Sequence, residues 1–262
     1  MKILKSLLFF LLFCPFNNLL AFQSGLYQTP EYLITSGITI LDRSPSGFLH
    51  TPAIPMSGFE SGITYLYSRS ELVISSSTAG HRFKNIGVGI GFISLNNDLI
   101  SDSSLILNCS YNFPMIAIGC NLKYNFMDVE NYDYTAGFSG DMGFSWKWKA
   151  IESAITVINL YPHKIEGIDL PLSTKVQFSY NTCDLLKLGV GIEMEENYPA
   201  ELQFSTRLRI TDMIFFLSGY QTDINALNFG IKLIFNQFNL TYAVHNHPDL
   251  KLTHACAIGY TW

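Results

Sequence analysis

The chain has 262 residues, of which 48% are hydrophobic, 14% aromatic and 14% charged. This composition is too apolar for an exported soluble domain and not apolar enough for a helical membrane protein, but it is typical of a barrel in which every second residue faces lipid. The formal net charge of −5 gives no support to nucleic-acid binding, which normally appears as a basic stripe, so nucleic acid is excluded as a partner.

The first residues have the pattern of a secretory signal. Lys2 and Lys5 precede the apolar run of residues 7–13, and Ala21 is a small residue suitable for cleavage. This pattern predicts a signal peptide over residues 1–21. A lipoprotein signal through Cys14 is the weaker alternative, because a phenylalanine precedes that cysteine. No later stretch reaches the roughly 18 uncharged apolar residues that a spanning helix needs.

Residues 22–60 form a lead-in that is interrupted by Pro45, Pro52 and Pro55, so they cannot make one long regular element. The segment is too long for a turn and too apolar for a free tail. We therefore predict that it folds into the lumen as a plug, with a periplasmic strap or a flexible lead-in as the alternative. The candidate ligand or plug residues are Phe48, His50, Pro52, Ala53 and Met56.

From Ser61 onward, apolar residues alternate with small or polar ones, for example over residues 86–92 and 116–126. About fourteen such segments occur, each close to the ~10 residues of a tilted membrane strand. Residues 61–262 are therefore predicted to form an all-β, transmembrane antiparallel β-barrel of about 14 strands. A soluble β-sandwich or lipocalin-like barrel is the alternative, and its apolar face would point inward.

The connections alternate in length as they do in membrane barrels. Short turns are expected at residues 113–114, 182–184, 211–212 and 236–237, and the longest of the polar links between them is 159–171. If both termini are periplasmic, the longer links become the extracellular loops. Glycines that alternate through residues 86–91 are expected to make room inside the barrel.

Charged residues of both signs fall on the inward face of the expected strands. Because charges in a narrow lumen must be solvated or paired, the mixed signs predict ion pairs and a blocked lumen. The inward set consists of Lys123, Asp141, Lys147, Lys175, Lys187, Glu193, Glu201, Arg207, Arg209 and Lys232.

The cysteines that remain after removal of Cys14 are interpreted as small hydrophobic residues rather than as a disulfide framework. A turn centred on Pro114 would place Cys109 opposite Ile118 and Cys120 opposite Leu107. That offset makes a bridge between the two cysteines doubtful.

No constellation of residues predicts catalysis or a cofactor. His245, His247, His254 and Asp249 lie near one another in the last hairpin, but alternation sends His245 to the lumen and His254 to the outer face, which argues against a metal site. The acidic residues near Glu193 are better explained as a solvated loop than as a calcium site. No Gly-x-Ser-x-Gly elbow occurs. We expect a protein that is not an enzyme and holds neither a cofactor nor a metal.

The chain ends in a strand that alternates through residues 252–262 and closes on two aromatic residues. Tyr260 and Trp262 are typical of the carboxy-terminal signal that the barrel-insertion machinery reads. This last segment is therefore predicted to be the closing strand of the barrel.

Two short patches carry a resemblance to known families. Residues 49–53, Leu-His-Thr-Pro-Ala, resemble the Asn-Pro-Ala segment before the first strand of barrels of the long-chain fatty-acid transporter (FadL) type. Residues 247–254 resemble the Gly-Asp-Leu-Gly-x-Thr-His ending of the PorV/PorQ barrels of type IX secretion. Both groups have fourteen strands. The resemblance implies that Pro52 and Ala53 belong to the plug entrance.

The same resemblance implies that Asp249, Thr253 and His254 form the closing hairpin. It favours a non-enzymatic outer-membrane barrel of the PorV/PorQ type, an accessory of protein export, with uptake of a hydrophobic small molecule as the alternative. The partners expected on this basis are outer-membrane lipid, the barrel-insertion machinery, secreted proteins or other secretion components, and a hydrophobic small molecule.

Overall fold

A computed structural model describes residues 29–97, 99–130, 134–161, 164–165, 168–196 and 198–262. The predicted signal peptide and residues 22–28 of the predicted plug lie outside the described residues. Within the part that is described, no helix is both long and apolar enough to cross a membrane.

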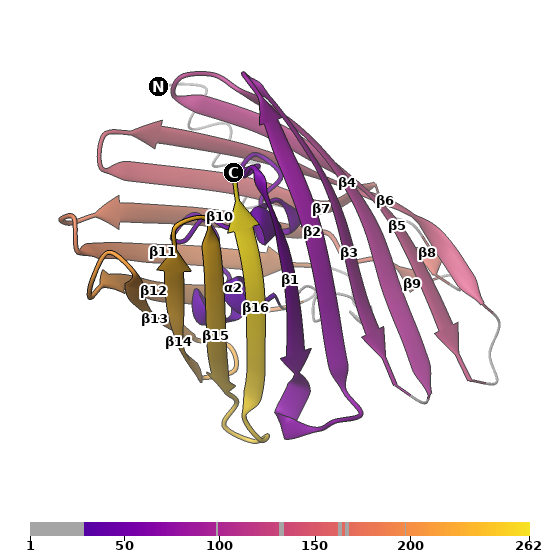
Figure 1. Ribbon diagram of the computed structural model, residues 1–262. Helices are drawn as coiled ribbons and strands as arrows, with labels where there is room; N and C mark the ends of the chain where they lie inside the picture. The colour runs from indigo at the N-terminus through magenta and orange to yellow at the C-terminus, as the bar shows by residue number, and fades with distance from the viewer. Residues whose placement is uncertain (1–28, 98, 131–133, 162–163, 166–167, 197) are drawn as a thin grey trace.

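Fourteen antiparallel strands close into a barrel (Figure 1), as the alternation predicts. Each strand pairs with its neighbour in the chain, except that β7 pairs with β10 and β1 pairs with β16. The strands of the barrel are β1 (Gly58–Tyr65), β2 (Val73–Phe83), β3 (Ile86–Asn96), β4 (Ile100–Asn112), β5 (Ile116–Val129), β6 (Thr135–Trp148), β7 (Ile151–Tyr161), β10 (Ser173–Asn181), β11 (Leu186–Glu195), β12 (Glu201–Arg209), β13 (Ile214–Gln221), β14 (Ala226–Phe235), β15 (Phe238–Asn246) and β16 (Thr253–Thr261).

The remaining elements are short. A two-stranded hairpin of β8 (Lys164–Ile165) and β9 (Ile168–Asp169) lies in the link between β7 and β10. Helix α2 (Pro30–Ile34) and the 3-10 helix η1 (Pro45–Leu49) precede the barrel, and a second 3-10 helix, η2 (Leu66–Ser68), follows β1.

The barrel closes through β1 and β16, whose register runs from Gly58 opposite Thr261 to Tyr65 opposite His254. The short connections lie at the end of the barrel that holds Gly58 and Thr261, which we call the turn end. The longer links lie at the opposite end, which we call the loop end. Because every strand of the barrel is paired on both sides, the barrel sheet has no exposed edge within the described residues, which is the condition for a sheet in lipid.

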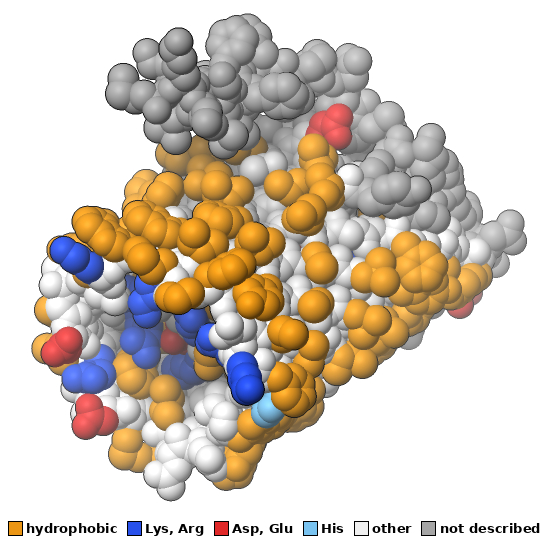
Figure 2. All heavy atoms as spheres, turned by 90° about the horizontal axis from the view of Figure 1, so that it is seen from above, with side chains coloured by type: hydrophobic (Ala, Val, Ile, Leu, Met, Phe, Trp, Pro, Cys, Tyr) orange, Lys and Arg blue, Asp and Glu red, His pale blue; other side chains and the backbone are white. Residues whose placement is uncertain are grey.

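Large apolar side chains point away from the barrel axis on every strand (Figure 2). In β5, for example, Ile118 and Leu122 are exposed. Asn121 and Lys123, the residues on either side of Leu122, are buried in the lumen. The alternative of a soluble barrel with an inward apolar face is therefore wrong. The outward side chains instead match the lipid-facing band of a membrane barrel.

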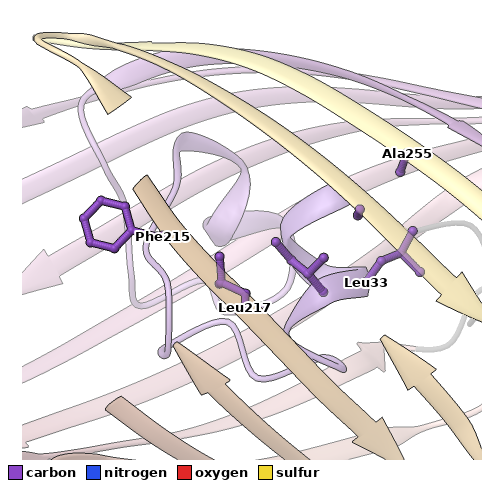
Figure 3. Packing of buried hydrophobic residues seen from close by; sticks show 6 residues of the cluster. Leu33, Phe215, Leu217 and Ala255 are labelled. Carbon is purple, nitrogen blue, oxygen red and sulfur yellow. The ribbon is translucent and has the colours of Figure 1, made fainter. Parts of the chain in front are cut away.

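Residues 29–57, which we call the luminal segment, lie inside the barrel. Thr29 caps helix α2 by accepting a hydrogen bond from the backbone N–H of Tyr32, and Pro30 occupies the first helical turn. The helix is anchored by an apolar cluster in which Leu33 lies between Leu217 of β13 and Ala255 of β16 (Figure 3).

A second apolar cluster holds η1 against another part of the wall, on the far side of β1 from β16. It contains Phe48 and Leu49 of the luminal segment together with Ile74, Ile93 and Ile106 from β2, β3 and β4. The luminal segment is thus packed against two separate parts of the wall, and the prolines restrict it to short helical turns, as the sequence predicts.

The pairing of β4 with β5 corrects the expected register of the cysteines. Cys109 lies directly opposite Cys120, because the backbone N–H of Phe113 donates to the carbonyl of Ile116. The turn is therefore centred one residue later than the position of Pro114 suggests. Both cysteines are free and point outward.

The outward face of β5 provides a test of the membrane assignment. Leu122 is 51% exposed on the outer wall near the middle of its strand. We expect Leu122→Arg to lower the free energy of unfolding in lipid bilayers by about 2–4 kcal/mol, because the guanidinium would enter hydrocarbon. Denaturant titration in vesicles measures this change. Leu250→Arg, in an exposed loop, is the control, and equal effects of the two substitutions would contradict the assignment.

Candidate functional site

The wall of the lumen is lined with glycines where the luminal segment approaches it most closely. A Cβ atom on Gly119 would lie 2.1 Å from the carbonyl oxygen of Pro52, and one on Gly143 would lie 2.9 Å from the Cδ of the same proline. Gly87, Gly89 and Gly91 make the same kind of contact with Pro55, Phe48 and Leu49. The alternating glycines therefore make room inside the barrel, as their spacing indicates.

In the half of the lumen near the turn end, ion pairs tie the luminal segment to the wall. Asp42 accepts from Lys232 at 2.7 Å and lies 3.0 Å from the Nε of Arg207. Arg43 pairs with Glu152 of β7. Burial by itself would raise the pKa of Asp42, but Lys232 and Arg207 outweigh it and hold the pKa below its usual value. Asp42 is therefore ionised at neutral pH.

In the half near the loop end, Tyr32 is the centre of the contacts. Lys175 donates to the Tyr32 hydroxyl at 2.8 Å and pairs with Glu193 at 2.7 Å, and its ammonium lies 4.5 Å from the centre of the tyrosine ring. The ring stacks on His50 with 4.2 Å between centroids. Burial and the nearby Glu193 raise the pKa of the Tyr32 phenol, which therefore stays protonated.

A third polar group lies on the wall itself. Lys123 pairs with Asp141 at 2.7 Å, and both side chains are almost completely buried. Asn159 donates its backbone N–H to Asp141 and accepts from Lys123 through its side chain. The register of β6 and β7 shifts at this point, which lets Asn159 reach both partners.

The free space in the barrel is divided by the luminal segment. At the turn end, Figure 2 shows a hollow lined by lysine and arginine side chains. This hollow is a cavity of about 390 Å³ that is bordered by Asp42, Arg43 and Met56 of the luminal segment and by Lys187 and Arg207 of the wall.

Two smaller cavities lie on the other side of the luminal segment. One of about 160 Å³ opens among α2, η2 and the loop ends of β13 and β15, and one of about 40 Å³ lies beside His50. Tyr32 lines both of them. A molecule that crosses the barrel would therefore have to displace part of the luminal segment.

The structure brings together the candidate plug residues of the sequence. Phe48, His50, Pro52 and Ala53 are all buried in the lumen, and Met56 borders the turn-end cavity. The backbone carbonyl of Pro52 accepts from Asn108, and that of Phe48 accepts from Asn121. Whether any of these residues contacts a ligand stays a prediction.

The residues of the expected closing hairpin do not converge. Thr253 is buried and accepts from the backbone N–H of Tyr67, whereas His254 lies on the outer face and bonds to the Tyr242 hydroxyl. Asp249 lies in the loop, where its backbone N–H donates to His247. Among the described residues, no group of three or more His, Cys, Asp or Glu side chains could hold a metal ion.

The two aromatic residues at the carboxy terminus lie on the outer wall at the turn end. Trp262 donates through its indole N–H to His81 of β2 at 2.8 Å, and Tyr260 donates to the side chain of Gln237. The indole thus reaches across β1 to β2 at the point where the barrel closes. Their role as an assembly signal stays a prediction.

Sequence reasoning identifies the inward charges of the wall but not their partners in the luminal segment. Glu31, Asp42 and Arg43 are the partners that it misses, together with Tyr32. The available signal is the presence of these charges within an otherwise apolar lead-in. A charge in such a segment needs a counter-charge if the segment is to be buried.

No protein-family model and no curated protein matches the sequence. Solved structures are similar to the barrel. The CymD monoaromatic hydrocarbon channel aligns with a TM-score of 0.69 at 10% identity, over 91% of this chain and 98% of that chain. A Pseudomonas aeruginosa FadL homologue aligns with a TM-score of 0.63 at 8% identity, over 89% of this chain and 98% of that chain. The P. putida toluene transporter TodX aligns with a TM-score of 0.61 at 8% identity, over 90% of this chain and 98% of that chain.

At these identities the likeness concerns the fold alone. It shows that the chain has the fold of the FadL-like channels, a closed barrel of fourteen antiparallel strands. These three structures give no support to the predicted resemblance to PorV/PorQ barrels.

The close approach of Pro52 to the wall can be tested by adding one methyl group. In Gly119→Ala the new Cβ meets backbone atoms of the luminal segment, so we expect the free energy of unfolding to fall by about 1–3 kcal/mol, as in overpacked cores. Gly140→Ala is the matched control, because its Cβ would lie 3.5 Å from the nearest atom, an ordinary contact. Denaturant unfolding compares the two variants, and equal stabilities would contradict the packing.

The environment of His50 predicts a pH dependence. Burial, followed by Lys175 and Lys123, holds the pKa of His50 well below its usual value. The unfolded chain therefore binds a proton below about pH 6.5 that the folded protein does not bind, so the stabilising contribution is complete above that pH and is lost as the pH falls towards the folded pKa. Between pH 7.5 and 5.5 the loss is about 1 kcal/mol.

We expect His50→Gln to remove this part of the pH dependence. Unfolding curves at pH 7.5 and 5.5 measure it, and His254→Gln, on the outer face, serves as the control. An unchanged difference between the two pH values in His50→Gln would show that the folded protein holds a charged imidazole at this position.

Proposed function

We propose that this protein is an outer-membrane channel for a hydrophobic small molecule, which passes when part of the luminal segment moves. The observation that carries the proposal is the luminal segment itself, which separates the loop-end cavities from the turn-end cavity inside a FadL-like barrel. Of the similar structures, CymD is by name a monoaromatic hydrocarbon channel and TodX a toluene transporter.

The proposal includes an orientation and a processed amino terminus. Barrels of this kind have short periplasmic turns and longer extracellular loops, so the turn end faces the periplasm and the loop end faces outward. The signal peptide would be removed near residue 21, the luminal segment would act as the plug of a barrel that begins near residue 61, and insertion would depend on Tyr260 and Trp262.

The contacts of the luminal segment support a movable plug. Tyr32 leaves Lys175 and Glu193 paired with each other if it moves away, so its departure strands no buried charge. The barrel is also held closed at β1 and β16 independently of the luminal segment. Movement inside the lumen therefore need not open the wall.

A role in protein export is a weaker candidate. It depends on the PorV/PorQ resemblance of residues 247–254, in which Asp249 is an exposed loop residue and Thr253 and His254 point to opposite faces of β16. No further contact in the described part of the chain favours it.

The experiment that tests the proposed function is a reversible tether between the luminal segment and the wall. Ser36 and Gly219 are suitable, because the Ser36 Cβ lies 3.0 Å from the position of a Cβ on Gly219, and a shift of about half an ångström gives disulfide geometry. The variant Ser36→Cys/Gly219→Cys is made in a background that lacks Cys109, Cys120, Cys183 and Cys256.

We expect the oxidised variant to lose uptake of labelled toluene into vesicles and the reduced variant to recover it. The cysteine-free parent, treated with the same oxidant and reductant, is the control. Undiminished uptake by the fully oxidised variant would show that passage does not require movement of this part of the luminal segment.

A further inference from the structure

The larger of the two cavities at the loop end, which we call the loop-end cavity, has the size of one aromatic ring. Its volume is about 160 Å³, and its walls include Tyr32, Tyr67, Ile224, His245 and His247. An apolar cavity of about 150 Å³ in an unrelated protein binds benzene, so the space suits a single ring and is too small for a long alkyl chain. Tyr32, Tyr67 and His247 are each only partly buried, which leaves ring surface available to a ligand.

Two of the walls are rings in edge-to-face contact. Tyr67 and His247 have centroids 6.2 Å apart and planes at 87°, and His247 lies 6.5 Å from His245. Aromatic ligands pack favourably in such surroundings, since ring edges and faces carry opposite partial charges.

The hydrogen bonds of His247 fix which of its nitrogens carries the proton. The backbone N–H of Asp249 can only donate, and it donates to Nδ1 of His247 at 3.2 Å. Nδ1 is therefore the acceptor, and in the neutral ring the proton lies on Nε2. His247 thus offers an N–H donor through Nε2.

A chain of hydrogen bonds places the proton of His245 on the other ring nitrogen, Nδ1. The carboxylate of Glu201 accepts from Nε2 of Gln221 at 2.9 Å, so the Oε1 of Gln221 is free to accept from Nδ2 of Asn228. The Oδ1 of Asn228 must then accept from Nδ1 of His245, which lies 2.5 Å away. Nε2 of His245 is left as an acceptor, and within the described residues it has no hydrogen-bond partner.

One donor and one acceptor on neighbouring imidazoles are complementary to a hydroxyl group. A hydroxyl can donate to Nε2 of His245 and accept from Nε2 of His247 at the same time. We propose that the loop-end cavity binds a single-ring aromatic molecule that carries a hydroxyl group, a phenol, in preference to an unsubstituted hydrocarbon. This proposal rests on the proposed function, for which the cavity would be the first binding site.

Tyr32 connects this cavity to the interior. It borders the loop-end cavity on one side and the smaller cavity beside His50 on the other. A ligand held by the two histidines therefore lies against the residue of the luminal segment that would have to move for the ligand to advance.

Three probes of similar size separate the contributions of ring and hydroxyl. Phenol has a donor and an acceptor, anisole has only the acceptor, and toluene has neither. Affinities are measured by calorimetry with the protein from the outer membrane in lipid nanodiscs, after subtraction of binding to empty nanodiscs. We expect phenol to bind about fivefold to tenfold more tightly than anisole, the effect of one net hydrogen bond, and anisole to bind more tightly than toluene, because only anisole can accept from His247.

The variants assign that preference to the two histidines. In His245→Phe we expect phenol affinity to fall to that of anisole, while anisole and toluene are unaffected. His254→Phe, on the outer face, is the matched control and should leave all three affinities unchanged. If His245→Phe does not fold, His247→Phe provides a second test. It removes the donor that phenol and anisole share, so both should lose affinity relative to toluene while phenol keeps its lead over anisole.

Equal affinities for phenol, anisole and toluene in the native protein would overturn the proposal. An unchanged lead of phenol over anisole in His245→Phe, or an unchanged lead of phenol over toluene in His247→Phe, would overturn it as well. Failure here is distinct from failure of the proposed function. A protein without phenol preference whose toluene uptake is blocked by the Ser36–Gly219 tether would still be a channel. A protein with the preference but with uptake insensitive to the tether would have the binding site without the proposed route.

Discussion

The structure depends on one constraint, which is that hydrocarbon offers no hydrogen-bond partner to the backbone. A sheet in such a medium must close, and here the closure is the eight-residue register between β1 and β16. Once fourteen strands are closed, the lumen is wider than the side chains of the wall can fill, since about eight strands is the size at which they suffice. The luminal segment occupies the part of the lumen that the side chains of the wall leave empty.

Filling the lumen with chain rather than with water has its own requirements. Where the segment runs against the wall, the wall must lose its side chains, and glycines such as Gly119 and Gly143 occupy these positions. Where the segment carries a charge, the wall must supply the opposite one, as Lys232 and Arg207 do for Asp42. The polar lumen is therefore explained by the needs of a buried segment as well as by contact with water.

The alternation of residues predicts much of this from the sequence, because an outward or inward position follows directly from a period of two. It identifies the strand count, the outer face and the inward lysines. It does not determine register, which depends on turn geometry, so that a turn shifted by one residue brings Cys109 opposite Cys120. The relay from Glu201 to His245 is also inaccessible to sequence, because it joins four strands through side-chain atoms.

The free energy needed to move the luminal segment differs from one part of it to another, because its contacts with the wall differ. If Asp42 left its place, Arg207 would lose its carboxylate, and among the described residues Lys232 would keep only Glu31, at 3.8 Å. Buried charge would then be poorly compensated, which costs several kcal/mol. If Tyr32 left, the Lys175–Glu193 pair would persist, and the loss would be a hydrogen bond and the contact with His50. The apolar anchor at Leu33 lies next to Tyr32 and limits how far that end can move. A rearrangement that admits a ligand from the loop end is therefore least costly at the side chain of Tyr32, and it becomes progressively more costly towards Asp42.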